Sequence, residues 1–526
     1  MSNNPQPYYI TTAIDYVNAA PHLGHAYEKI ATDVMARFQR LQGKDVFFLT
    51  GTDEHGIKVQ KTAESKGVTP KQHCDETAKE FVKAWDYLGI TYQRFIRTTD
   101  DDHYALVARM WKTLRDKGLI EKRSYEGLYC PGCEAFKTKR DLNDDGECVN
   151  HQRKPDVVRE ENWFFKLTQF KDQIAAHIKN NPGFILPQFR ADEVLKMLDE
   201  LEDISVSRPK TTVSWGIPVP DDDTQVIYVW IDALSNYITG IGCPLGNSKY
   251  ADDALFNKYW GSKSNPNAVH VIGKDILRFH AIYWPAMLMA ADLPLYKTLF
   301  VHGFINLNDA KISKSVGNVV SPFDVAKRFD LPNPDPIRYY LMKVAKFGYD
   351  GNFTEDDFKN VVNADLANNL GNLLNRTLNM TNKYFDGIVP EGVATDYNDP
   401  HVGDAYEDFD FQEAIVRLFF RVDHANKEIN DKEPWNLHKE GKDQELRWVI
   451  YNALNTLRTT AILISPITPT MAQSIWEQLG YTSRIEDVRW SDLETPLPPG
   501  QKINLGQPIL PRLDSELAGA AKKAGK

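Results

Sequence analysis

Two short motifs, far apart in the chain, carry residue types suited to phosphate chemistry. The first is His22-Leu23-Gly24-His25, which follows a strand-like run and opens an amphipathic segment. Two imidazoles that flank a glycine at a helix N-terminus can donate hydrogen bonds to phosphate oxygens, where the helix dipole also favours an anion. Gly24 would let a nucleotide approach the backbone closely. On its own, the motif is also compatible with an ordinary pair of surface histidines at a turn.

The second motif is Lys311-Ile312-Ser313-Lys314-Ser315, in a polar stretch from Asn306 to Val319 whose composition predicts a mobile loop. Two ammonium groups three residues apart suit a polyphosphate, because they neutralise charge that develops during phosphoryl-group chemistry. A solvated lysine loop is the commoner meaning of such a spacing. The two motifs together, one after the first strand and one after the last, are much more specific than either alone.

The elements around these motifs predict a parallel α/β sheet. Strand-like runs lie at residues 8–12, 46–50, 226–230, 269–272 and 298–302. Between the first two runs, apolar residues recur at helical spacing, and Gly43 is well placed to end that helix. These residues are Ile30, Val34, Phe38 and Leu41. Strand, helix, strand is the βαβ unit of a parallel sheet, and its alternation is interrupted from about 118 to 222, so an insertion splits the α/β domain.

Beyond about residue 360, helical periodicity replaces the strand signals. Examples are Ile415, Leu418, Phe419 and Val422, and then Ile450, Leu454, Leu457 and Ala461. Apolar residues at this spacing form one buried face of each helix, so the last third of the chain is predicted to be a helix bundle.

The insertion contains a cluster of potential metal ligands. Cys130-Pro131-Gly132-Cys133 is followed by Cys148-Val149-Asn150-His151. C-x2-C and C-x2-H supply four ligands at knuckle spacing, which suits a tetrahedral, structural Zn²⁺ with no open position. Two unrelated thiol pairs are the simpler alternative, and a redox dithiol is disfavoured because the motif lies in a polar insertion. With only five cysteines in the whole chain, a disulfide framework is not expected.

Composition limits the class of protein. The chain has 526 residues, which at roughly 100 to 200 residues per domain predicts three or four domains. A hydrophobic fraction of 42% is ample for globular cores, and a net charge of -10 argues against indiscriminate polyanion binding while allowing a local basic face. No apolar run is long enough for a membrane helix, and the first residues do not form a signal peptide. We therefore expect a cytoplasmic protein that does not enter a membrane.

The order of His22-Leu23-Gly24-His25 and Lys311-Ile312-Ser313-Lys314-Ser315 on a split α/β fold resembles the class I aminoacyl-tRNA synthetases, whose signatures are usually written HIGH and KMSKS. The Leu23 and Ile312 replacements are apolar for apolar. Within that class, several segments resemble the methionyl-tRNA synthetase family, and the resemblance covers residues from about 8 to 510. These segments are Thr12–Asn18, Gly51–Gly56, Tyr228–Leu234, Gly273–Asp275 and Val301–Phe304.

The resemblance implies a fold and a division of the chain. The fold is a Rossmann-like parallel-sheet catalytic domain, split by a zinc-knuckle insertion and followed by an α-helical bundle that binds an anticodon. The catalytic domain would occupy residues 1–117 and 223–300, the insertion 118–222, the lysine loop and a stem-contact region 301–360, and the helical domain 361–526. The implied activity is the ATP-dependent, AMP-forming activation of L-methionine to methionyl-adenylate and its transfer to tRNA, with Mg²⁺ accompanying ATP.

The resemblance also implies roles for individual residues. The catalytic groups would be His22, His25, Lys311 and Lys314. ATP would contact His22, Gly24, His25, Gly273, Asp275 and Lys314. Methionine would lie among Ala13, Ile14, Tyr16, Trp230, Ala233, Leu234, Tyr237 and His302, with Asp53 paired to its ammonium group. Without the motifs, the apolar residues assigned to methionine would be interpreted as ordinary core residues. Asp275 would be interpreted as a helix N-cap.

In the helical third, the resemblance assigns recognition of a CAU anticodon to Asn372, Arg376 and Trp435. Asn372 and Arg376 are four residues apart and so share a helix face, while a tryptophan at a helix start can stack on an unpaired base. Without the resemblance they would be a cap, a polar pair and a core tryptophan.

Two alternatives remain at this stage. One keeps the fold but has cysteine or an aliphatic amino acid as the substrate. The insertion is too short for the separate editing domain of the enzymes for aliphatic amino acids, and a zinc ion with four protein ligands leaves no position at which cysteine could bind. The other is a tRNA-binding, synthetase-like protein that lacks amino-acid activation. Because no oligonucleotide-binding domain follows the bundle, we expect a monomer.

Overall fold

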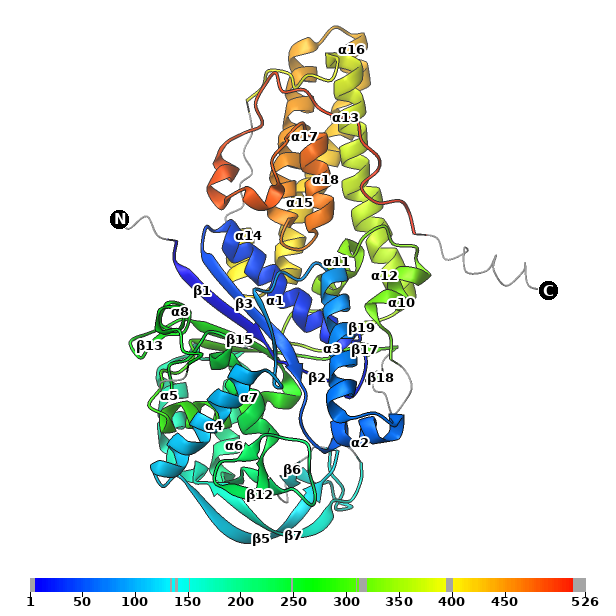
Figure 1. The fold of residues 1–526 in the computed structure, drawn as a ribbon. Coiled ribbons are helices and arrows are strands. Elements are labelled where there is room, and N and C mark those ends of the chain that lie inside the picture. Colours follow the sequence, from blue (N-terminus) through cyan, green and yellow to red (C-terminus); the bar gives the residue numbers. More distant parts are fainter. Residues whose placement is uncertain are drawn as a thin grey trace, which may run out of the picture.

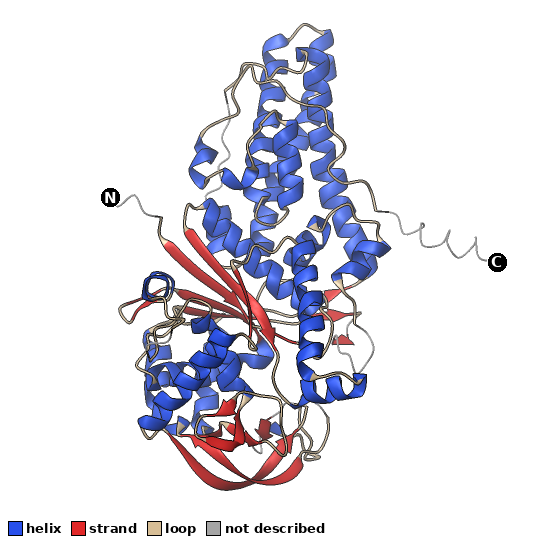
Figure 2. Cartoon of the chain, in the orientation of Figure 1, coloured by secondary structure: helices blue, strands red, loops and turns tan. Residues whose placement is uncertain are grey.

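The computed structural model describes residues 5–132, 135–137, 141–150, 152–246, 249–308, 310–311, 319–393 and 401–513. Three regions follow one another along the molecule (Figure 1). A helix bundle forms one end, a twisted parallel sheet lies in the middle, and a long antiparallel ribbon forms the other end. Figure 2 shows the sheet in red between two groups of helices.

The central sheet is parallel throughout and has the order β2-β3-β1-β15-β16-β8, with β4 also paired to β3. Its strands are β1 (Pro7–Thr12), β2 (Asp15–Tyr16), β3 (Asp45–Asp53), β4 (Arg94–Arg97), β8 (Ile185–Leu186), β15 (Ala268–Gly273) and β16 (Thr298–His302). Ile10 on β1 pairs with Phe48 on one side and Val269 on the other, and all three are buried. Burial on both faces is typical of parallel strands.

The predicted βαβ unit is confirmed. Helix α1 (Leu23–Leu41) connects β1 and β3, and the four apolar residues predicted to form its inner face are buried. The helix ends just before Gly43, which has φ +83°, a conformation that glycine adopts without a steric cost. The first strand therefore delivers the chain directly to the N-terminus of α1.

One predicted strand is wrong. Residues 226–230 do not form a strand of the parallel sheet: β12 (Asp222–Ile227) pairs antiparallel with β10 (Ser207–Pro209) and β11 (Pro218–Val219), and Val229 already begins helix α7 (Val229–Thr239). A short apolar run has no periodicity that separates a strand from a buried helix turn. Here the run crosses the boundary between the two.

The insertion is built on an antiparallel ribbon of β5 (Ile120–Cys130) and β7 (Asp156–Phe165), with β6 (Ala135–Lys137) and β9 (Ile204–Ser205) at its edges. It also contains helices α5 (Lys171–Asn180) and α6 (Gln188–Met197). Between these helices, β8 returns to the central sheet and pairs with β16. The segment 118–222 therefore contributes one strand to the central sheet and is not a structurally separate insertion.

Helices dominate the chain after β19 (Gly351–Phe353), as predicted. They are α12 (Glu355–Val362), the π-helix η6 (Asn363–Leu370), α13 (Gly371–Phe385), α14 (His401–Glu407), α15 (Phe411–Lys432), α16 (Pro434–Lys439), α17 (Asp443–Ile464) and α18 (Pro469–Gln478). Arg338 on α11 (Asp335–Lys343) links the bundle to the sheet region, because it donates to Asp33 on α1 at 2.8 Å and to the carbonyl of Ile467, after α17, at 2.8 Å. Buried residues of α1, of β1 and β3 and of the bundle form one continuous apolar core.

Candidate active site

Two adjoining cavities open at the carboxyl ends of the central strands, where ligands of parallel sheets usually bind. Their volumes are about 690 Å³ and about 290 Å³. They share part of their lining, so they are two lobes of one site. The shared residues are Ala13, Ile14, Tyr16, Asp275, Ile276 and Phe304.

The smaller cavity gathers the residues predicted to contact ATP. His22, Gly24, His25, Gly273 and Asp275 all line it. His302 also lies there rather than in the larger cavity, where it was expected beside methionine. Asp275 is not a helix N-cap: it lies within a 3-10 turn, η4 (Lys274–Ile276), that begins after Gly273.

The two histidines of the first motif form a fixed pair. His22 caps α1, its Nδ1 accepts from the backbone N–H of Gly24 at 3.1 Å, and the Nδ1 of His25 accepts from the N–H of His22 at 3.2 Å. The rings stack with centroids 3.8 Å apart. A Cβ on Gly24 would lie 2.9 Å from the His22 ring, so this arrangement requires glycine.

Burial lowers the pKa of His22 to about 4 and the pKa of His25 well below its usual value. Both rings are therefore neutral at pH 7. Because each Nδ1 accepts a hydrogen bond, the proton of each ring is on Nε2. The motif thus offers neutral N–H donors beside the helix N-terminus, rather than two imidazolium charges.

A buried charge network lies beneath this pair. Lys29 on α1 donates to Asp15 at 2.8 Å and to Glu28 at 2.9 Å, and all three are almost fully buried. Lys29 also donates to the carbonyl of Ala13 at 2.9 Å, and Glu28 lies 3.0 Å from Nε2 of His302. The network therefore connects the wall shared by the two cavities to β16.

The larger cavity gathers the residues predicted to contact methionine. Ala13, Ile14, Tyr16, Asp53, Trp230, Ala233, Leu234 and Tyr237 all line it. The last four lie on α7 and Asp53 ends β3. The cavity lining thus combines apolar and aromatic side chains with a carboxylate.

Sequence reasoning missed the partners of this wall. Phe279 stacks on Trp230 with ring centroids 3.5 Å apart, and Nε2 of His280 lies 2.7 Å from the hydroxyl of Tyr237. Both belong to a π-helical turn, η5 (Phe279–Tyr283), and both line the cavity. The other ring nitrogen of His280, Nδ1, lies 3.0 Å from the carbonyl oxygen of Ile276, which also lines the cavity.

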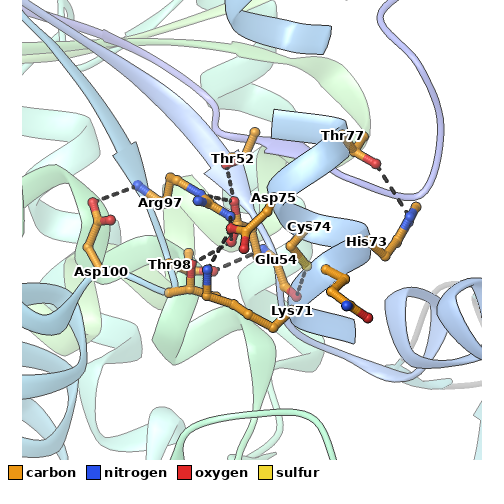
Figure 3. A network of polar contacts seen from close by, with 12 residues as sticks. Thr52, Glu54, Lys71, His73, Cys74, Asp75, Thr77, Arg97, Thr98 and Asp100 are labelled. Carbon is orange, nitrogen blue, oxygen red and sulfur yellow. Dashed lines mark hydrogen bonds and ion pairs between the residues drawn. The ribbon is translucent and has the colours of Figure 1, made fainter. Parts of the chain in front are cut away.

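Behind Asp53, Glu54 holds the end of β3 in place (Figure 3). Its buried carboxylate accepts from Thr52 at 2.7 Å and from Arg97 at 2.6 and 2.9 Å, and Arg97 also pairs with Asp75 on α3 (Pro70–Tyr87). The Sγ of Cys74 donates to the Glu54 carbonyl at 3.4 Å. These contacts tie β3, β4 and α3 together directly beside the cavity.

The predicted metal ligands are described only in part. Cys130 and Cys148 are buried, whereas Cys133 and His151 lie outside the described residues. In the described part of the chain, no three His, Cys, Asp or Glu side chains are grouped so that they could hold a metal ion. Gly132 and Asn150, one from each half of the motif, both line the larger cavity, so both halves reach the same cavity.

The second motif falls largely outside the description. Lys314 and Ile312 are outside it, and of Lys311 only the backbone is described, where β18 (Ala310–Lys311) pairs with β17 (Ile305–Leu307). Because β17 begins at Ile305, which lines the smaller cavity, this hairpin starts beside that cavity.

The predicted anticodon residues lie on two helices of the bundle, α13 and α16. Asn372 is exposed on α13, and Arg376, one turn later, donates to Asn430 on α15 at 2.9 Å. Asn430 precedes α16 closely, and Trp435 on that helix is 37% exposed. Trp435 is therefore not a core residue.

Comparison with known proteins agrees with this geometry. The family model for class I tRNA synthetases (M) matches residues 8–153 and 140–378, and the model for the anticodon-binding domain of tRNA ligase matches residues 401–509. The chain is 43% identical to the methionine–tRNA ligase of Synechocystis sp., over 95% of this chain and 93% of that protein. The chain belongs to the methionyl-tRNA synthetase family.

Other members of the methionyl-tRNA synthetase family are similarly close. The methionine–tRNA ligase of Caldanaerobacter subterraneus is 42% identical over 98% of this chain and 81% of its own length. The solved Mycobacterium tuberculosis methionyl-tRNA synthetase in complex with methionyl-adenylate is 37% identical, with a TM-score of 0.88 over 96% of this chain and all of that one.

Among the helices described here, none has the length and apolar character of a membrane span.

Proposed function

We propose that the chain forms methionyl-adenylate across the two adjoining cavities, with methionine in the larger and ATP in the smaller. As a member of its family, the chain is a class I methionine–tRNA ligase. The observation that carries the assignment of the lobes is that the aromatic wall and Asp53 line one cavity while the histidine motif lines the other.

In the larger cavity, the thioether of methionine would pack against Trp230 and Tyr237, because sulfur makes favourable contacts with aromatic rings. Asp53 would pair with the ammonium group. The hydrogen bond between Tyr237 and His280 fixes the tyrosine ring, and the Phe279 stack fixes Trp230. Ala13 and Ile14, which line both cavities, would then place the methionine carboxylate at the boundary between the lobes.

In the smaller cavity, the triphosphate would meet the N-terminus of α1. The methionine carboxylate oxygen attacks the α-phosphorus, the bond to the bridging oxygen breaks, and diphosphate leaves. His22 and His25 would donate from Nε2 to phosphate oxygens, and Lys311 and Lys314 would neutralise the leaving group. Gly273 and Asp275 would contact the nucleoside. A ribose hydroxyl at the 3′ end of tRNA then displaces AMP.

We propose that two metal ions take part. Mg²⁺ would enter with ATP and neutralise its phosphates. One Zn²⁺ would be held by Cys130, Cys133, Cys148 and His151, and with four ligands it would be structural. The burial of Cys130 and Cys148, and the presence of Gly132 and Asn150 in the lining of one cavity, support this site.

At the far end of the bundle, Asn372, Arg376 and Trp435 would read the CAU anticodon of tRNA(Met), with Trp435 stacked on an unpaired base. The exposure of Asn372 and Trp435 supports this role. We further propose that the enzyme is a monomer that acts in the cytoplasm.

The test is amino-acid-dependent exchange of labelled pyrophosphate into ATP, run without tRNA against methionine, leucine, isoleucine, valine and cysteine. Exchange with methionine alone is expected. Exchange with another amino acid would overturn the assignment of the larger cavity. If no exchange occurs even when Mg²⁺ and zinc are supplied, the result would favour a tRNA-binding protein that does not activate an amino acid. The His22→Ala variant provides the matched inactive control.

A further inference from the structure

Two exposed aromatic side chains form a pair beside the larger cavity. Phe189, on α6, is 39% exposed, and Tyr349, in the segment between α11 and β19, is 49% exposed. Their ring centroids lie 5.4 Å apart with the planes tilted by 39°. Single exposed aromatic residues are common, but these come from distant parts of the chain and meet at one place.

The neighbours of both rings reach the cavity. Arg190, next to Phe189, lines the larger cavity, and its guanidinium lies 4.7 Å from the Phe189 ring. Asp350, next to Tyr349, accepts from Lys274 at 2.7 Å, and Lys274 lines the same cavity. The aromatic pair therefore adjoins the lining of the larger cavity as part of its rim, next to the cationic side chains of Arg190 and Lys274.

The backbone holds this rim in a fixed position. A Cβ on Gly303 would lie 2.2 Å from the backbone carbon of Tyr349, so the two segments are in direct contact. Gly348 has φ +108°, and a Cβ there would lie 2.7 Å from Pro187, which precedes α6. Tyr349 is thus held between β16 and α6, and little conformational freedom would be lost when a ligand binds.

We propose that Phe189 and Tyr349 stack on the unpaired nucleotides at the 3′ end of tRNA where that end enters the larger cavity. The inference rests on the proposed function, because the ester forms on the terminal ribose and a single-stranded RNA end must therefore pass the rim. Unpaired bases bind proteins by stacking on aromatic rings, with cationic side chains near their phosphates.

The cationic groups at the rim suit such a ligand. The side chain of Arg190 is 15% exposed and donates to Glu193 at 2.8 Å, and among the described residues its Nε has no hydrogen-bond partner. A planar guanidinium beside an aromatic ring can extend a stacking surface or bind a phosphate. Lys274 supplies a second ammonium group on the same side.

The first experiment separates amino-acid activation from transfer. In Phe189→Ala, Tyr349→Ala and the double variant, methionine-dependent pyrophosphate exchange should remain within twofold of wild type. Charging of tRNA(Met) should fall, with kcat/KM for tRNA reduced about tenfold by each loss of a base stack. Phe189→Tyr and Tyr349→Phe should restore charging, and Tyr250→Ala, at an exposed tyrosine outside both cavity linings, serves as the matched control.

The second experiment identifies the part of the RNA that is bound. Wild type should bind tRNA(Met) more tightly than the same tRNA lacking its last three nucleotides, whereas the double variant should bind both equally. Unchanged charging in the double variant would overturn the proposal. If the double variant lost affinity equally for both RNAs, the contact would lie elsewhere on tRNA, and the proposal would be overturned. A fall in pyrophosphate exchange equal to the fall in charging would overturn it too. Absence of exchange in the wild type would instead contradict the proposed function.

Discussion

The ammonium group of Lys29 donates to the carbonyl oxygen of Ala13 at 2.9 Å, in the centre of the site. Lys29 is fully buried on α1, and Ala13 lines both cavities. The contact joins the helix that carries the histidine motif to the wall proposed to hold methionine. Asp15 and Glu28 keep the buried charge paired, so the ammonium can remain charged there.

Lys29→Met is expected to impair both stability and methionine activation. Removing one member of a buried charge network leaves its carboxylates without compensation, which typically costs about 3 to 5 kcal/mol. The free energy of unfolding in urea should fall by about that amount, and kcat/KM for methionine in pyrophosphate exchange should fall at least tenfold. Lys71→Met is the matched control, since Lys71 forms an exposed ion pair with Asp75 (Figure 3). Equal effects of the two substitutions would contradict the role of Lys29.

Stability should fall on mild acidification. Burial lowers the pKa of His280 to about 4, whereas an unfolded histidine titrates near pH 6.5. Between these values the unfolded chain binds the proton and the folded protein does not, so the free energy of unfolding decreases as the pH falls from 6.5 towards 4. The contribution of His280 is up to about 3 kcal/mol. Urea unfolding at pH 7 and pH 4.5 should show a smaller difference in the free energy of unfolding for His280→Gln than for wild type.

The zinc proposal predicts one bound ion per chain. Cys148→Ala should abolish zinc binding, because three ligands rarely hold a structural ion tightly, and should lower the unfolding temperature. Zinc content is measured by atomic absorption after dialysis. Cys243→Ala is the matched control, since Cys243 is equally buried but lies outside the motif. Full zinc content in Cys148→Ala would remove that residue from the ligand set.

Trp435→Ala should weaken recognition of tRNA without affecting activation. Loss of one stacked base corresponds to about 1 to 3 kcal/mol, so kcat/KM for charging should fall by roughly tenfold or more. Pyrophosphate exchange should be unchanged, because Trp435 lies in the helix bundle, far along the molecule from the cavities. Phe420→Ala on α15, which removes a more exposed aromatic ring, should leave charging intact. A charging rate equal to wild type in Trp435→Ala would contradict its role at the anticodon.

The sequence by itself determined the elements with strong periodicity and the motifs at their ends. Apolar spacing in α1 and the buried runs of β1, β3, β15 and β16 are local properties of the chain, and strands of this type bring their carboxyl ends to one edge of a sheet. The family resemblance assigned the histidine motif, Gly273 and Asp53 to one site, and the common edge of the parallel strands explains why they lie together.

Tertiary structure alone decided how the site is divided and supported. His302 was expected beside methionine but lies in the other cavity, because its contact with Glu28 depends on how α1 packs on β16. His280 and Phe279 became part of the larger cavity through a π-helical turn that the sequence does not distinguish. The pairing of β8 with β16, and of Phe189 with Tyr349, joins segments distant in sequence. Such contacts depend on the packing of whole elements, which local residue patterns do not encode.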